Sequence, residues 1–162
     1  MGSLPAAAGL LLRLQESGFG VWVAESSWAY PLILTLHTVG LALLVGTSAF
    51  IDLRVLGVGS EVPLAPLKGL SPVRWSGLAL NVVTGLALFV AAAAEKGAQT
   101  IFYVKLSIIA LALMTDGRLR RGIFLEGVAT DLRTTFEAKR LAASSLLLWA
   151  GAITAGRLMA YL

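Results

Sequence analysis

The segment that decides the fold runs from Trp28 to Phe50 and reads WAYPLILTLHTVGLALLVGTSAF. Its polar interruptions are threonines, a serine and one histidine, His37. A helix that crosses the hydrocarbon core of a bilayer needs about 20 mostly apolar residues. We therefore predict that this segment spans a membrane.

The composition of the whole chain also favours a membrane protein. Of the 162 residues, 57% are hydrophobic and 14% are charged, whereas about 25% are charged in an average soluble domain. The mean hydropathy of +0.84 leaves too few polar residues to cover the exterior of a soluble fold. Disorder, a nucleic-acid-binding domain and an ordinary cytosolic enzyme are therefore excluded. The chain is predicted to be in contact with a lipid bilayer, and nucleic acid is not an expected partner.

Three further apolar segments follow the first one. We place these spans at about residues 75–94, 101–116 and 141–162. The second of the three is short unless it extends through Thr115 and Asp116. The predicted fold is an all-α integral membrane protein, with four transmembrane helices in a bundle over residues 28–162 and no second domain.

Residues 1–27 are predicted to form an amphipathic helix that lies at the membrane interface. The apolar stretch from Leu4 to Leu14 is too short to cross a bilayer. No Lys or Arg precedes it, which argues against a signal peptide. Ser26 and Ser27 are suited to cap the first span, since hydroxyl side chains are favoured at helix N-termini.

The connections between the spans differ in their turn residues and in their charge. Residues 52–74 contain three prolines, so we predict a non-helical or broken loop there, and residues 95–100 are predicted to form a tight turn. The connection after the first span carries three Lys and Arg, and the long connection after the third span carries six. The other side has only Arg13 and Lys96, with Arg157 near its face.

This charge asymmetry predicts the orientation, because cytoplasmic loops of membrane proteins carry an excess of Lys and Arg. Both termini are expected to face outward, into the periplasm of a bacterial inner membrane. The same asymmetry accounts for the net charge of +4 without a nucleic-acid partner.

The chain has no cysteine and only one histidine. Disulfides, thiolate zinc sites and cysteine-ligated iron–sulfur clusters are therefore excluded. A metal site made of several histidines from one chain is excluded as well. His37 is the first candidate for a functional residue, since ionisable side chains within a span are costly and often functional.

The predicted topology brings three basic side chains to the outer half of the bundle. His37 lies roughly 14 Å below Trp28 at 1.5 Å per residue, and Lys105 and Arg157 lie at about one turn from the same face. Gly40 follows His37 on the same helical face and removes side-chain bulk where a flat ligand can approach.

An imidazole in an apolar bundle is the usual axial ligand of a b-type haem. In this hypothesis His37 is the metal ligand, Gly40 lines the haem, and Lys105 and Arg157 pair with the propionates. The alternative interpretation is that His37 hydrogen-bonds a neighbouring helix, that Gly40 permits close packing, and that the two cations reach the lipid head groups. On the inner side, the Asp52/Arg54 pair is interpreted as a structural lock.

The sequence resembles two groups of membrane proteins. The first resemblance rests on the stretches 25–31 (ESSWAYP), 37–46 (HTVGLALLVG) and 52–57 (DLRVLG), and on the ending around Trp149, Gly156 and Tyr161. These are similar to a family of small bacterial inner-membrane proteins of unknown function. The resemblance implies four spans and no assigned activity.

The second, more distant resemblance rests on residues 102–106 (FYVKL). This stretch is similar to the aromatic–x–Lys–Leu segment of HemJ-type protoporphyrinogen oxidases and of CopD-like copper-resistance proteins. HemJ proteins bind haem b, so the resemblance implies a haem-ligand role for His37 and a supporting role for Lys105. The stretch around His37 does not reproduce the HemJ signature.

Two hypotheses follow for the function. In the first, the protein binds haem b and takes part in electron transfer or in oxidation of a quinone-like or porphyrin-like substrate. In the second, it is a small permease or accessory membrane subunit without haem, which moves a small solute or a copper ion. No motif of a known enzyme class is present, so an enzymatic activity is left open, and so is a homo-oligomeric state.

Overall fold

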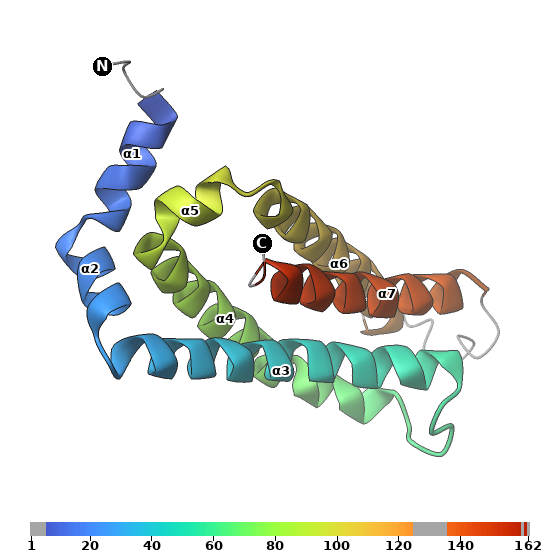
Figure 1. Cartoon of the computed structure of the whole chain (residues 1–162). Coiled ribbons are helices and arrows are strands. Elements are labelled where there is room, and N and C mark those ends of the chain that lie inside the picture. Colours follow the sequence, from blue (N-terminus) through green and yellow to red (C-terminus); the bar gives the residue numbers. More distant parts are fainter. Residues whose placement is uncertain (1–5, 125–135, 160, 162) are drawn as a thin grey trace.

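The computed structural model describes residues 6–124, 136–159 and 161, and its regular structure within these ranges is entirely helical (Figure 1). The elements in chain order are α1 (Ala6–Gln15), α2 (Gly18–Glu25), α3 (Ala29–Leu56), the 3-10 helix η1 (Ala65–Leu70), α4 (Ser71–Ala91), α5 (Ala93–Ala98), α6 (Thr100–Phe124) and α7 (Phe136–Leu158). Four helical segments are long and apolar enough to cross a membrane, namely α3, η1 with α4, α6 and α7. This agrees with the predicted number of spans.

The long helices pack in two pairs. Helix α3 packs along α4, α6 packs along α7, and the pairs meet chiefly where α3 contacts α7 (Figure 1). Successive long helices run in opposite directions, so α3 begins, α4 ends, α6 begins and α7 ends on the same side. We call this side the α5 end, after the short helix that joins α4 to α6, and the opposite side the η1 end.

The α3–α4 pair crosses at two glycines. A Cβ built on Gly40 would lie 2.9 Å from the backbone nitrogen of Asn81, and a Cβ on Gly77 would lie 2.8 Å from that of Leu44. Real Cβ atoms do not approach backbone atoms this closely. Only glycine therefore allows the two helix backbones to come together here, as small residues do in membrane helix pairs.

The N-terminal segment forms two helices rather than the single helix expected over residues 1–27. Ser17 separates them, because its hydroxyl accepts a hydrogen bond from the Gly20 N–H at 3.1 Å and caps α2. The Gln15 side chain accepts a hydrogen bond from the Ala94 N–H at 2.9 Å and so fixes α1 to α5. At the start of α3, Ser26 accepts from the Ala29 N–H at 3.3 Å, in line with the capping role expected for the serines.

The helix bounds differ from the predicted spans mainly at the η1 end. Helix α3 continues from Phe50 to Leu56, and α6 continues from residue 116 to Phe124. The loop expected over residues 52–74 contains η1 and the first turn of α4, and the tight turn expected over residues 95–100 is largely helix α5. The prediction ended the helices at charged residues, and it was wrong there because several of those charges are paired inside the protein.

The connection from α3 to η1 is fixed by Arg54. Helix α3 ends at Leu56 and is capped by Gly57, whose φ of 106° is in the left-handed region that glycine adopts most readily. The Arg54 guanidinium then donates to the carbonyls of Ser60 and Val62. Arg54 is thus a structural lock of this turn, as expected, although it locks backbone carbonyls and not Asp52.

Candidate functional site

The candidate haem ligand His37 lies on the face of α3 that packs against α4. Its Nδ1 atom is 3.0 Å from the hydroxyl oxygen of Thr84 on α4. The Thr84 hydroxyl lies 2.6 Å from the carbonyl oxygen of Leu80, one turn earlier, to which it donates. The side chain of Thr84 is buried, so this chain of contacts is shielded from solvent.

The contacts of Thr84 favour one tautomer of His37. A hydroxyl has one proton, and the short contact to Leu80 uses it. The Thr84 oxygen therefore accepts from His37, which requires the proton of the neutral imidazole on Nδ1. The lone pair of the ring is then on Nε2, the atom that ligates a metal when the other nitrogen is a donor.

Two further residues of α4 hold the histidine in place. Asn81 donates its side-chain amide to the His37 carbonyl at 2.9 Å. A Cβ on Gly85 would lie 3.1 Å from the Cε1 atom of the ring, so the absence of a side chain at Gly85 makes room for the imidazole. The orientation of His37 is thus set by Asn81, Thr84 and Gly85.

Lys105 belongs to α6 and is the second basic residue that the sequence predicted for this site. It is within electrostatic reach of the imidazole, and its aliphatic stem packs against Gly156 of α7. A Cβ on Gly156 would lie 3.4 Å from the Cε of Lys105. Residues from α3, α6 and α7 therefore converge near the α5 end.

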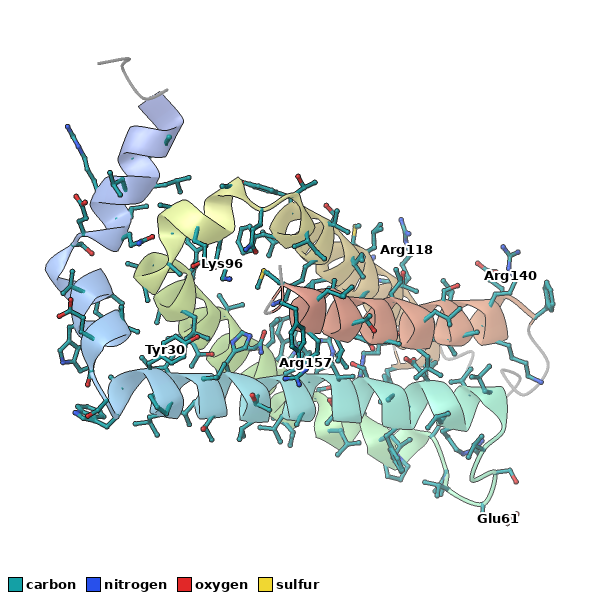
Figure 2. All side chains as sticks on the ribbon, viewed as in Figure 1. Tyr30, Glu61, Lys96, Arg118, Arg140 and Arg157 are labelled. Atoms are coloured by element: carbon teal, nitrogen blue, oxygen red, sulfur yellow. The ribbon has the colours of Figure 1, made fainter. Side chains whose placement is uncertain are left out.

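The remaining candidates contribute less to this site. Arg157 is exposed near the C-terminal end of α7, and no ion pair joins it to another described residue (Figure 2). Gly40 does not open space for a ligand, because the backbone of α4 fills the space next to it. Among the described residues, no group of three or more metal-ligating side chains is arranged to hold a metal ion.

A second group of polar side chains lies nearer the η1 end, and we call it the buried polar layer. Its members come from all four long helices and are at most 9% exposed: Ser48 and Asp52 of α3, Arg74 of α4, Asp116 and Arg120 of α6, and Ser145 of α7. Serine–aspartate and aspartate–arginine pairs four residues apart place their side chains on one helical face.

The centre of this layer is the Asp116 carboxylate. Arg74 contacts one of its oxygens at 2.5 Å, and the Nε of Arg120 lies 3.0 Å from both oxygens. Arg120 also reaches the Thr47 carbonyl on α3 at 3.4 Å. A single carboxylate therefore connects α4 to α6 and holds two buried guanidinium groups.

Asp52 is the other carboxylate of the layer, and its surroundings differ. It lies within electrostatic reach of Asp116 and Arg120 and close to the Ser145 hydroxyl. Neither of its oxygens makes a hydrogen bond of normal geometry to a described residue, although the side chain is 0% exposed. The hydroxyls of Ser48 and Ser145 and the indole N–H of Trp149 are also buried and unpartnered among the described residues.

Two clusters of apolar side chains flank the buried polar layer, one toward each end of the long helices. Toward the α5 end lies a cluster of Leu44, Ala112, Trp149 and Ala152. Toward the η1 end lies a cluster that includes Val55, Leu67, Leu119, Ile123 and Ala138. The polar side chains are thus separated from both ends of the protein by close-packed hydrocarbon.

This layer was not predicted from the sequence as a possible site. Asp116 was expected at the very end of the third span, Arg120 in the connection after it, and Arg74 in the loop before the second span. The available signal was the spacing of four residues between polar side chains in otherwise apolar segments, as in Ser48/Asp52 and Asp116/Arg120.

No family model, no curated protein and no solved structure matches this chain.

Proposed function

We propose that this protein is a multi-pass membrane protein that binds haem b through His37 and has a redox or electron-transfer role. In this proposal α3, α4, α6 and α7 form a transmembrane bundle in a bacterial inner membrane. The α5 end and both termini face the periplasm. The haem lies in the periplasmic half of the bundle.

The observation that carries the proposal is the hydrogen bond from His37 Nδ1 to Thr84. Histidines that ligate metals usually donate their other ring N–H to a fixed acceptor, which sets the tautomer and the ring orientation. Thr84 supplies such an acceptor within an apolar helix pair. Gly85 leaves space for the imidazole on the same face of α4.

Of the other predicted site residues, Lys105 and Arg157 are suited to a bound haem and Gly40 is not. Lys105 lies near His37 and is suited either to pair with a propionate or to occupy the sixth position, which otherwise is open or filled by a second subunit. Arg157 is exposed near the same end and is suited to a propionate at the membrane surface. Gly40 is left out of the proposed site, because α4 occupies the space beside it.

When bound, haem b supplies one-electron redox chemistry. The Thr84 hydroxyl contacts the His37 ring, and Gly85 leaves space beside it. Electron transfer to a protein partner and oxidation of a quinone-like or porphyrin-like substrate are both compatible with this arrangement.

The competing proposal is a small permease or accessory subunit without haem. The optical spectrum of the purified protein distinguishes the two. We expect a Soret band in the wild type that is lost in His37→Ala and at least ten-fold weaker per folded protein in Thr84→Val, on the order of the effect of removing the partner of a ligating histidine. Thr84→Ser keeps the hydroxyl and should retain the band.

Thr38→Val is the matched control for Thr84→Val. Thr38 also donates to the carbonyl four residues earlier, but it is exposed and does not contact His37. Haem occupancy in this variant should equal that of the wild type. A colourless folded wild-type protein after expression with excess haem, or an equal loss in Thr38→Val and Thr84→Val, would contradict the proposal.

A further inference from the structure

The buried polar layer contains one carboxyl group, that of Asp52, which takes part in none of the ion pairs of the layer. Asp116 makes ion pairs with two guanidinium groups, whereas Asp52 makes no ion pair with a described residue and has only the Ser145 hydroxyl close to its carboxyl. A buried ionised carboxylate without such partners is strongly disfavoured. The layer therefore has a specific place where an additional proton or small ligand is stabilised.

The charged side chains around Asp52 favour its ionised form, whereas burial favours its neutral form. Arg74 and Arg120 face the layer from α4 and α6, and Asp116 offsets one of the two positive charges. The four ionisable side chains sum to zero when Asp52 is ionised, and to one positive charge when it is protonated. Burial favours the neutral carboxyl and the residual positive charge favours the carboxylate, so both states are accessible.

The same neighbours make a proton a better ligand than a metal cation. A sodium or calcium ion needs about six oxygen ligands, and the unpartnered oxygens here are those of Asp52, Ser48 and Ser145. The other unpartnered groups are N–H donors of Arg74, Arg120 and Trp149, which oppose a metal ion. A proton requires only one carboxylate oxygen, and the carboxyl then donates to a nearby hydroxyl such as that of Ser145.

The position of the layer suits a proton that is held away from water. The apolar clusters on both sides exclude bulk solvent, yet α3 ends only one turn beyond Asp52, at Leu56. The shorter route to water is therefore toward the η1 end, past the cluster that contains Val55 and Leu67.

We propose that Asp52 is a proton-binding site that exchanges with the aqueous phase at the η1 end. An Asp52 oxygen accepts a proton from a hydronium ion, an O–H bond forms, and a water molecule is released; the reverse step returns the proton. Ser145 supplies a hydroxyl close to the carboxyl, and Ser48 precedes Asp52 by four residues on the same face of α3. This site is separate from the His37 site and does not depend on haem.

Infrared difference spectroscopy of the full-length protein in lipid vesicles tests the proposal. Spectra recorded in acidic and in alkaline buffer should show the C=O stretch of a protonated carboxyl, with slow hydrogen–deuterium exchange. The band should be lost in Asp52→Asn and should appear at a shifted frequency in Asp52→Glu, which also serves if the asparagine variant does not fold. Glu137→Gln removes an exposed carboxyl of α7 and should leave the band unchanged.

Three results would overturn the proposal. The first is a slowly exchanging band that persists in Asp52→Asn or has the wild-type frequency in Asp52→Glu. The second is the absence of such a band at every pH at which the protein is folded. The third is a band that changes when sodium chloride is replaced by choline chloride, because that result would assign the site to a metal cation.

Discussion

At the scale of single residues, Asp116 has the largest expected effect on stability. Its carboxylate holds Arg74 and Arg120, and all three side chains are buried. Asp116→Asn removes the carboxylate that contacts both buried guanidinium groups, and breaking a buried ion pair in this way costs about 3–5 kcal/mol. Thermal unfolding in detergent should therefore show a large decrease in Tm.

Glu137→Gln is the control for this substitution. Glu137 is exposed at the start of α7, and substitutions of that kind usually change stability by about 0.5 kcal/mol or less. If Asp116→Asn and Glu137→Gln gave the same Tm, the ion pairs around Asp116 would not contribute to the stability of the fold.

At the α5 end, the rise per residue placed His37, Lys105 and Arg157 in the same half of the bundle, and in the structure Lys105 is within electrostatic reach of His37. Thr84 was not identified, because threonine is common in apolar helices and its role depends on the rotation of α4 about its axis. Hydropathy does not specify that rotation. It follows from the contact between Gly40 and Gly77.

At the scale of elements, the crossing of α3 and α4 makes a prediction for its glycines. Gly77→Ala introduces a Cβ that would lie 2.8 Å from the Leu44 backbone nitrogen. The helices must separate to accommodate it, and such overpacking costs about 1–3 kcal/mol. Because Asn81 and Thr84 lie on the same helix as Gly77, the separation should also weaken the contacts to His37. The measurements are Tm and, for the haem proposal, the Soret absorbance per folded protein.

Gly46→Ala is the matched control, since Gly46 lies in the interior of α3 and nothing lies within 4 Å of the position of its Cβ. Alanine is the better helix former by about 1 kcal/mol, so this variant should have an unchanged or slightly higher Tm. A lower Tm in Gly46→Ala than in Gly77→Ala would contradict the role assigned to the crossing.

Element bounds were predictable from hydropathy only as far as the charged residues. The apolar segments located the four long helices. However, the first and third spans were predicted to stop at or before Asp52 and Asp116, whereas α3 and α6 continue beyond these residues. The second span was predicted to begin after Arg74, whereas α4 begins before it, at Ser71. A single charge in a span is costly, and that cost is offset when charges from different helices pair. Such pairing depends on which helices are neighbours, and this information is not contained in the local sequence.

At the scale of the whole molecule, the charge distribution predicts the orientation. Of the nine Lys and Arg assigned to the cytoplasmic side, those that the structure describes lie in η1 or in the parts of α3, α4, α6 and α7 nearest the η1 end. The chain has no cysteine, so single cysteines serve as unique labels. An impermeant maleimide added to intact spheroplasts should modify Glu25→Cys at the α5 end and should not modify Glu61→Cys, which lies beyond α3 (Figure 2).

Modification of Glu61→Cys only after the membrane is permeabilised is the internal control, because it shows that the residue is accessible to the reagent. Labelling of Glu61→Cys and not of Glu25→Cys in intact spheroplasts would reverse the orientation. The proposed haem would then lie in the cytoplasmic half of the bundle.

The Arg74–Asp116 ion pair has a consequence for biogenesis. Helices α3 and α4 bring one carboxylate and one guanidinium to the polar layer, Asp52 and Arg74, and α6 and α7 bring the same complement, Asp116 and Arg120. Each helical hairpin of the proposed transmembrane bundle therefore carries no net charge in this region, which lowers the expected cost of its insertion. Arg74 meets Asp116 only when the two hairpins associate, so we expect association of the hairpins, rather than insertion, to select the correctly assembled protein.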